Sequence, residues 1–259
     1  MSLVVGTGIT IGTGITISST AGGGGGSIIT DDLIMQLDAS NPASYPGTGT
    51  TWFDISGNSN DGTINGAAYS ATNSGIFDFD GINDQVQIAD NANLRLSTTQ
   101  QRTIQVWVKF DALPALNTQR PVFGKLSSSF GFDGYWGGLF SITGSVRVVT
   151  NGTGIQRITT TAAPFLVTTD TWYLFTFISR ISSLAGSTKI YINDQEWAST
   201  QHGTDGYNES NPLYLGWIGS GVNSLYLDGK IGAAYFYTTG LSAADVAANF
   251  NATKSRYGL

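Results

Sequence analysis

Carboxylates are the only abundant groups in this sequence that could act in acid–base chemistry, and their spacing does not favour it. Of the 18 acidic residues only Glu196 and Glu209 are glutamates, and they lie in separate segments. A retaining glycosidase needs two carboxyl groups about 5–5.5 Å apart, one of them protonated near neutral pH. Asp78 and Asp80 share a face of one predicted strand, but Asp80 belongs to the following turn. The carboxylate pattern therefore argues against a glycoside hydrolase.

Nucleophilic and zinc chemistry lack the residues that they require. The chain has no cysteine, which excludes disulfides, thiolate catalysis and cysteine-based zinc sites. Its single histidine, His202, lies between Gln201 and Gly203 in a polar segment. A Ser-His-Asp triad would have to use His202, and no Gly-x-Ser-x-Gly turn accompanies it. We therefore expect a protein that is not an enzyme.

One loop concentrates the oxygen ligands that calcium prefers. Residues 54–62 read Asp-Ile-Ser-Gly-Asn-Ser-Asn-Asp-Gly, which places carboxylates and amides around a glycine. Asp54, Asn58 and Asp61 are the candidate ligands. Asp and Asn side chains also cap their own turns, and this alternative needs no metal. Calcium is the one cofactor that the sequence suggests.

Aromatic residues in polar or glycine-rich segments are candidates for stacking on sugar rings. The candidate ligand-binding residues are Asp133, Tyr135 and Trp136 in one segment, together with Tyr207 and Trp217. The alternative for Tyr135 and Trp136 is packing over the mouth of a sandwich or contact with a neighbouring subunit. Trp52, Trp107 and Trp172 lie in strand-like runs, and we expect them in the core. These residues favour glycan binding without catalysis.

The N-terminal residues form a repeat that a run of glycines separates from the rest. Residues 6–11 and 12–17 both read Gly-Thr-Gly-Ile-Thr-Ile. Ile9, Ile11, Ile15 and Ile17 alternate with threonine, as in a half-buried strand that must pair with a neighbour. We expect residues 1–20 to be an arm that anchors the protein or joins three copies; the alternative is a strand added to the main domain. Residues 21–27, Ala-Gly-Gly-Gly-Gly-Gly-Ser, form a flexible linker.

Residues 28–259 have the composition and patterning of an all-β domain. Charged residues make up only 12% of the chain, and threonine, serine, asparagine and glycine replace helix-favouring residues. Alternating runs such as Thr103–Phe110 and Thr188–Ile192 are separated by turn signals, and about a dozen such strands suffice for two stacked sheets. One short helix is expected after Ser242, where Asp245 completes a near capping box.

Charge and hydropathy exclude two classes of partner. The formal net charge is −6, whereas nucleic-acid binding needs a basic face. No apolar run reaches 18 residues, so we expect no membrane insertion. The first ten residues lack the charged start and apolar core of a secretory signal, which argues against a secreted protein.

Four segments in sequence order resemble the laminin-G-like, concanavalin A-like jelly-roll family. They are Trp52–Asn58 with Asp61–Thr63, Phe79–Val86, Thr103–Lys109, and Trp172–Tyr173 continuing through Lys189–Asp194 to Leu227–Gly232. The end of the chain also matches, with Tyr235–Tyr237 before the short helix. The resemblance covers about residues 30–259 and implies a sandwich of two antiparallel sheets with a C-terminal surface helix. Such domains often bind one calcium ion at a loop rim.

A single domain of this kind behind a Thr/Ile/Gly arm resembles structural proteins of tailed-phage virions. The resemblance implies a non-enzymatic protein of the virion surface, made in the host cytoplasm: a head fibre, a decoration protein or a tail-associated adhesin. Its arm would contact other virion proteins or form a homotrimer. Its head would hold weak affinity for a surface glycan, which multivalent display strengthens. The alternative is a lectin-like bacterial adhesin or carbohydrate-binding module.

Overall fold

The computed structural model describes residues 27–259 apart from short gaps. The gaps are residues 98, 116–117, 127–133, 141–144, 152–154, 160–166, 181–187, 201–209 and 220–224. Within the described ranges the helical elements are α1 (Ala243–Thr253) and the 3₁₀ helices η1 (Thr72–Ser74), η2 (Ala92–Leu94) and η4 (Lys254–Tyr257). None of these helices is long and apolar enough to cross a membrane.

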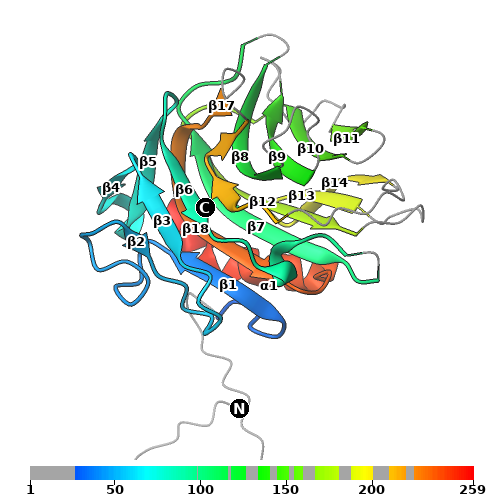
Figure 1. The fold of residues 1–259 in the computed structure, drawn as a ribbon, viewed down its shortest axis with the longest axis horizontal. Coiled ribbons are helices and arrows are strands. Elements are labelled where there is room, and N and C mark those ends of the chain that lie inside the picture. The colour runs from blue at the N-terminus through cyan, green and yellow to red at the C-terminus, as the bar shows by residue number, and fades with distance from the viewer. Residues whose placement is uncertain are drawn as a thin grey trace, which may run out of the picture.

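Most strands form two antiparallel sheets, which confirms the predicted all-β sandwich (Figure 1). In spatial order sheet A contains β14 (Gln195–Thr200), β13 (Thr188–Ile192), β12 (Trp172–Ser179), β7 (Arg102–Phe110), β18 (Asp228–Tyr237), β5 (Ile76–Asp80) and β4 (Ala68–Ser70), with β1 (Leu33–Asp38) paired to β18. Sheet B contains β11 (Ile155–Thr159), β10 (Ser145–Asn151), β9 (Gly134–Phe140), β8 (Gln119–Leu126), β15 (Leu213–Leu215), β6 (Gln85–Ile88), β3 (Gly62–Asn65) and β2 (Thr51–Trp52). A separate pair consists of β16 (Trp217–Ile218) and β17 (Leu225–Tyr226).

The main core lies between the two sheets because inward and outward positions alternate along each strand. On β5 the rings of Phe77 and Phe79 are fully buried, whereas the intervening Asp78 is partly exposed. Trp52 is fully buried in the same core, as predicted. Trp107 and Trp172 are also buried, but they belong to a second apolar cluster that includes α1.

The C-terminal helices close the outer face of sheet A, and Figure 1 shows α1 beside β1 and β18. The Trp107 ring on β7 stacks on Tyr257 with centroids 4.1 Å apart, and its Nε1 donates a hydrogen bond to Thr253 Oγ1 (2.9 Å). At the start of α1, Ser242 Oγ accepts from the Asp245 amide while the Asp245 carboxylate accepts from the Ser242 amide. The predicted capping box is therefore confirmed.

A buried polar network joins the start of the domain to this closed face. Asn249 on α1 donates to Gln105 Oε1 (2.6 Å) and to the Tyr237 hydroxyl oxygen (2.9 Å). Its Oδ1 accepts from the Ile29 amide (2.7 Å), and the Tyr237 hydroxyl donates to the Ile29 carbonyl (3.1 Å). Because side chains hold both backbone polar groups of Ile29, the domain begins on the helix-covered face.

Candidate binding surface

The outer face of sheet B presents one continuous row of residues that the strand register places side by side. In order from the β2 edge, the row is Thr51, Thr63, Gln87, Tyr214, Gly124, Trp136 and Val149. Side chains of directly opposed residues on one face of a sheet lie about 4.5–5.5 Å apart at Cβ. The row therefore crosses two regions of different character, one covered and one open.

The covered half of this face lies under β16. Trp136, Val149 and Ile218 form a small apolar cluster in which each is at most 5% exposed. A Cβ added to Gly124 would lie only 2.3 Å from Cγ2 of Ile218, so glycine permits β16 to approach β8. The strand pair β16–β17 thus closes this half against ligands.

The open half is a floor of neutral polar side chains on β2, β3 and β6. This floor consists of Thr51, Thr63, Asn65, Gln85 and Gln87, of which Thr63 and Asn65 are exposed and the others are partly exposed. The alternate residues on β3 and β6, including Val86 and Ile88, point into the core. Amide and hydroxyl groups both donate and accept hydrogen bonds, which suits them to pair with hydroxyl groups of a ligand.

Three aromatic side chains bound the floor where β15 meets β16 and β17. Tyr214 lies directly opposite Gln87, and its ring meets that of Trp217 edge-on with centroids 4.5 Å apart. The Trp217 ring lies 6.5 Å from that of Tyr226. All three residues are partly exposed, and burial raises the pKa of Tyr214. We call Tyr214, Trp217 and Tyr226 the aromatic wall.

Two polar atoms of this surface have no hydrogen-bond partner in the described part of the chain. They are Trp217 Nε1, a donor, and Gln85 Oε1, an acceptor, and both are shielded from solvent. The last residue pair of β6 and β15 is Val86 with Leu215, so Gln85 and Trp217 lie at the same end of this strand pair. An unmade hydrogen bond on a buried group costs about 1–3 kcal/mol, so both atoms would gain a partner from a ligand or water if their side chains turned outward.

Of the predicted aromatic residues that the structure describes, Trp217 lies in this surface, whereas Tyr135 and Trp136 are buried. Tyr135 is 4% exposed and its hydroxyl donates to the Leu94 carbonyl (2.5 Å), whereas Trp136 is 2% exposed beneath Ile218. The alternation along β9 sends the first ring into the core and the second under β16. Both rings are packing groups, in line with the alternative. Asp133 and Tyr207 lie outside the described residues.

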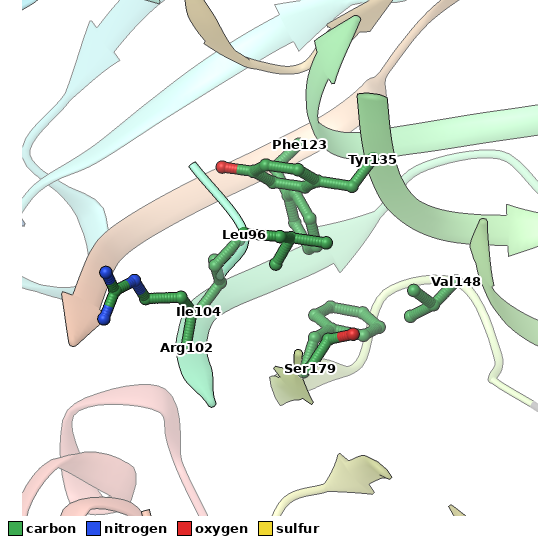
Figure 2. Close-up of a pocket in the computed structure, with 8 residues that line it drawn as sticks. Leu96, Arg102, Ile104, Phe123, Tyr135, Val148 and Ser179 are labelled. Atoms are coloured by element: carbon green, nitrogen blue, oxygen red, sulfur yellow. The ribbon is translucent and has the colours of Figure 1, made fainter. Parts of the chain in front are cut away.

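A small cavity beside Tyr135 does not change this conclusion (Figure 2). It is lined by Leu96, Arg102, Ile104, Phe123, Tyr135, Val148, Phe177 and Ser179. Figure 2 shows the Tyr135 ring beside Leu96 and Phe123. The cavity volume is about 10 Å³, which is room for about one water molecule and not for a sugar ring.

The candidate calcium loop is organised by its own hydrogen bonds. Asp54 Oδ1 accepts from the amides of Gln36 (2.8 Å) and Ser56 (2.9 Å), and Oδ2 accepts from the Ser56 hydroxyl and the Asn60 amide (both 2.9 Å). Asp61 Oδ1 accepts from the Asp54 amide (2.7 Å), while Asn58 Nδ2 donates to the Leu33 carbonyl on β1 (3.3 Å). No group of three His, Cys, Asp or Glu within the described ranges could hold a metal ion. Calcium at this loop stays a prediction from the sequence.

Carboxylates elsewhere in the described residues serve ion pairs and turns. Although burial alone would raise it, hydrogen bonds from Tyr191 (2.5 Å) and Lys189 (3.1 Å) lower the pKa of Glu196. Burial raises the pKa of Asp84, but this side chain closes a hairpin by accepting from the Asp80 amide (3.0 Å). Glu209 and His202 lie outside the described residues, as do Ile9, Ile11, Ile15 and Ile17 of the arm.

The sandwich with one closed and one partly open outer face defines a lectin-like β-sandwich. The chain matches the family model described as the concanavalin A-like lectin/glucanases superfamily over residues 79–247, which is more than half its length. The protein therefore belongs to this family, as the sequence motifs predicted. A search of curated proteins finds no significant match.

Solved structures of low sequence identity share the fold. Domain 4 of an extracellular GH43 arabinanase from Geobacillus stearothermophilus, in complex with arabinotriose, has a TM-score of 0.64 at 18% identity, covering 85% of this chain and 98% of that one. A structure of botulinum neurotoxin type C, whose cell entry depends on interaction with two ganglioside molecules, has a TM-score of 0.63 at 16% identity, covering 87% of this chain and 52% of that one. Trypanosoma rangeli sialidase in complex with sialic acid has a TM-score of 0.62 at 14% identity, covering 87% of this chain and 33% of that one.

Proposed function

We propose that this protein is a non-enzymatic, glycan-binding protein of a tailed-phage virion surface, with its sugar site on the open half of sheet B. The observation that carries glycan binding is the aromatic wall next to a floor of amide and hydroxyl groups. Binding sites for small ligands combine apolar or aromatic surface with a few placed polar groups. The wall supplies the first, and the floor supplies the second.

The proposal that the head is not catalytic rests on the chemistry of the same surface. The floor has no carboxylate that could act as acid or nucleophile, since its residues are Thr51, Thr63, Asn65, Gln85 and Gln87. Glycoside hydrolysis needs two carboxyl groups flanking the bond that is cleaved. A reducing-sugar assay on common polysaccharides tests this point, and turnover would overturn it.

The virion role is supported by the arrangement of the chain. An isoleucine-threonine repeat and a glycine run precede a head that begins at the closed face of sheet A, where Asn249 and Tyr237 hold Ile29. The floor and the wall lie on the opposite side of the sandwich. An arm attached to the particle would therefore direct the binding surface outward, and many copies would convert weak affinity into avidity.

A second candidate function is a carbohydrate-binding module of a secreted or surface protein of a bacterium. The similarity to domain 4 of the arabinanase, which extends over 98% of that chain, favours this alternative. Antibodies against the head separate the two: labelling of purified phage particles supports the virion role, and labelling of bacterial surfaces or culture medium supports the module.

Binding to an array of oligosaccharides, with the protein displayed on multivalent beads, tests the glycan site. We expect Trp217→Ala and Tyr214→Ala to weaken binding at least tenfold, because stacking surface is lost. Tyr69→Ala is the matched control, since Tyr69 is also a partly buried tyrosine but lies on β4 of sheet A. Unchanged binding by both wall variants would contradict the proposed site.

The arm is tested by the solution mass of the full chain and of a version that starts at Ser27, measured by light scattering. We expect a trimer that becomes a monomer when the arm is removed. Monomers in both cases would show that the arm binds another protein or its own head, and would favour a decoration protein over a fibre.

A further inference from the structure

The floor is unusual in that it is polar without being charged. Its side chains are two threonines, one asparagine and two glutamines, arranged as the pairs Thr51–Thr63, Thr63–Gln87 and Asn65–Gln85 across β2, β3 and β6. A site for a sialic acid, a uronic acid or a sulfated sugar needs a cation, because a carboxylate or sulfate must be matched by a positive donor. The floor supplies none.

Two cations on β8, Arg120 and Lys125, have partners within the protein. Arg120 donates to the Tyr226 carbonyl (3.3 Å) and lies 3.7 Å from Asp228 Oδ2. Lys125 on β8 is 1% exposed and bonds to Asp90 Oδ1 (2.5 Å). Lys125 is buried and thus closed to a ligand, whereas Arg120 is 26% exposed and is only partly engaged by Tyr226 and Asp228, since its Nε has no hydrogen-bond partner among the described residues. The net charge of −6 adds a long-range repulsion of anionic glycans.

The two polar atoms without a partner within the described ranges, Trp217 Nε1 and Gln85 Oε1, also favour a neutral ligand. Trp217 Nε1 can only donate and Gln85 Oε1 can only accept, and both lie at the same end of the β6–β15 pair. A sugar hydroxyl both accepts and donates, so it could pair with either kind of atom once the side chain turns outward. A carboxylate could pair with Trp217 Nε1 but not with Gln85 Oε1, because that oxygen is itself an acceptor.

From these contacts we infer that the open half of sheet B selects neutral oligosaccharides and discriminates against acidic ones. The inference rests on the proposed glycan-binding function and names its ligand class. Stacking on the aromatic wall would hold the sugar ring, and the amides and hydroxyls of the floor would bind its hydroxyl groups. Because no ion pair is formed, affinity would depend little on salt.

The test compares neutral oligosaccharides with acidic counterparts: lactose with 3′-sialyllactose, which adds one acidic residue, and a neutral pentose trimer with trigalacturonic acid, in which all three residues are acidic. We expect the full chain to bind at least one neutral member tenfold more tightly than the acidic members, with less than a twofold change between 50 and 500 mM NaCl. A preference for acidic members, or affinity that falls steeply with salt, overturns this inference alone. Binding to no member of either set overturns the proposed function and this inference with it.

Substitution of the floor provides the second measurement. Gln87→Lys places a cation next to Tyr214, and we expect it to shift the neutral-to-acidic preference at least tenfold toward acidic sugars. Thr63→Lys makes the same change at an exposed position and covers the case in which Gln87→Lys fails to fold. Gln195→Lys on sheet A is the control of equal charge and should leave the preference unchanged. If neither floor variant shifts it more than the control does, the inference is wrong.

Discussion

The two outer faces of the sandwich are built from the same kind of alternating strand and end in different surfaces. On sheet A the outward residues are large aromatics such as Trp107, Tyr235 and Tyr237, all at most 1% exposed beneath the C-terminal helices. On the open half of sheet B the corresponding positions are threonine, asparagine and glutamine. Burial of apolar area stabilises a fold, whereas exposed polar groups leave a surface free to bind. The first face therefore secures the domain, and the second is available for function.

The interactions that stabilise the closed face of sheet A and one end of sheet B also differ. The closed face is held by ring stacking, by neutral hydrogen bonds of Asn249 and by charged hydrogen bonds of Arg256, which also pairs with Asp38 at 2.6 Å. At one end of sheet B, the buried Lys125 of β8 is held by Asp90, which also bonds to Arg95. Acid should weaken the ion pairs of Asp90 more than the stacking of Trp107.

The largest effect is expected for Trp107→Ala on the closed face. Removing a buried tryptophan costs about 3–5 kcal/mol, a large share of the stability of an ordinary domain. Urea unfolding followed by circular dichroism should show this loss, while the glycan affinity of the remaining folded protein stays within twofold. Trp107→Phe keeps a stacked ring but loses the bond to Thr253, and we expect a cost of only about 1 kcal/mol. Equal losses for the two variants would contradict the role of the stack.

The next effect concerns Asp90 and its pH dependence. The hydrogen bond from Arg95, followed by that from Lys125, lowers the pKa of Asp90 against the opposing effect of burial. A lowered pKa contributes stability that is present above the unfolded value near 4 and is lost as the pH falls through the folded value. Asp90→Asn should cost about 3 kcal/mol at pH 7, because it leaves the cation of Lys125 short of its counter-charge.

Urea titrations of the wild type and of Asp90→Asn at pH 7 and pH 3 measure the contribution of Asp90 to the free energy of unfolding. The difference between wild type and Asp90→Asn should shrink between pH 7 and pH 3, because below about 4 the carboxyl of the unfolded chain takes up a proton and the advantage of the lowered folded pKa declines. The comparison of the two proteins removes the contribution of other carboxylates. A difference that stays constant with pH would mean that the ion pair adds no stability and that the variant acts through packing.

A smaller effect is expected for Asn249→Ala, which leaves Gln105 and the Ile29 amide without their partner. Each loss of a buried hydrogen bond costs about 1–2 kcal/mol, and relaxation of the chain start should keep the total near 2 kcal/mol. Hydrogen exchange of the Ile29 amide should become faster by at least tenfold, while exchange on β6 stays unchanged. Protection of Ile29 in the variant would show that apolar packing of Ile28 and Ile29, and not Asn249, holds the start of the domain.

The structural features that could be predicted from the sequence are those that depend on a local residue pattern. The capping box at Ser242 and the strands Thr103–Phe110 and Thr188–Ile192 depend on residues within a few positions of one another, and all three are present. Trp52 in the core follows from the same alternation. Order and spacing of such motifs were also specific enough to indicate the family before any comparison of structures.

The binding surface could not be predicted because it is made by strand pairing. Gln87, Tyr214 and Thr63 are far apart in the chain and meet only through the register of β3, β6 and β15. The sequence did show polar residues at alternate positions of 62–65 and 85–88. This pattern occurs in any strand with one face toward solvent, so it does not indicate a binding surface. The glycines around Tyr135 and Trp136 suggested a loop, so these two residues became candidates for sugar binding. In the structure the glycines lie in β9, where they allow close approach to the neighbouring strand, as at Gly138 against the Arg120 carbonyl.

The smallest expected effect is that of removing calcium with EDTA. If a calcium ion occupied the loop at 100 times its Kd, it would add about 2.7 kcal/mol, and its loss would lower the Tm by about 5–10 °C in a domain of this size. Asp54 already accepts four hydrogen bonds within its own loop and from Gln36 on β1, which occupies about all four lone-pair sites of its carboxylate. We therefore expect a Tm shift below about 1 °C on adding EDTA, and a drop of several degrees that excess calcium reverses would show instead that Asp54, Asn58 and Asp61 rearrange to bind the ion.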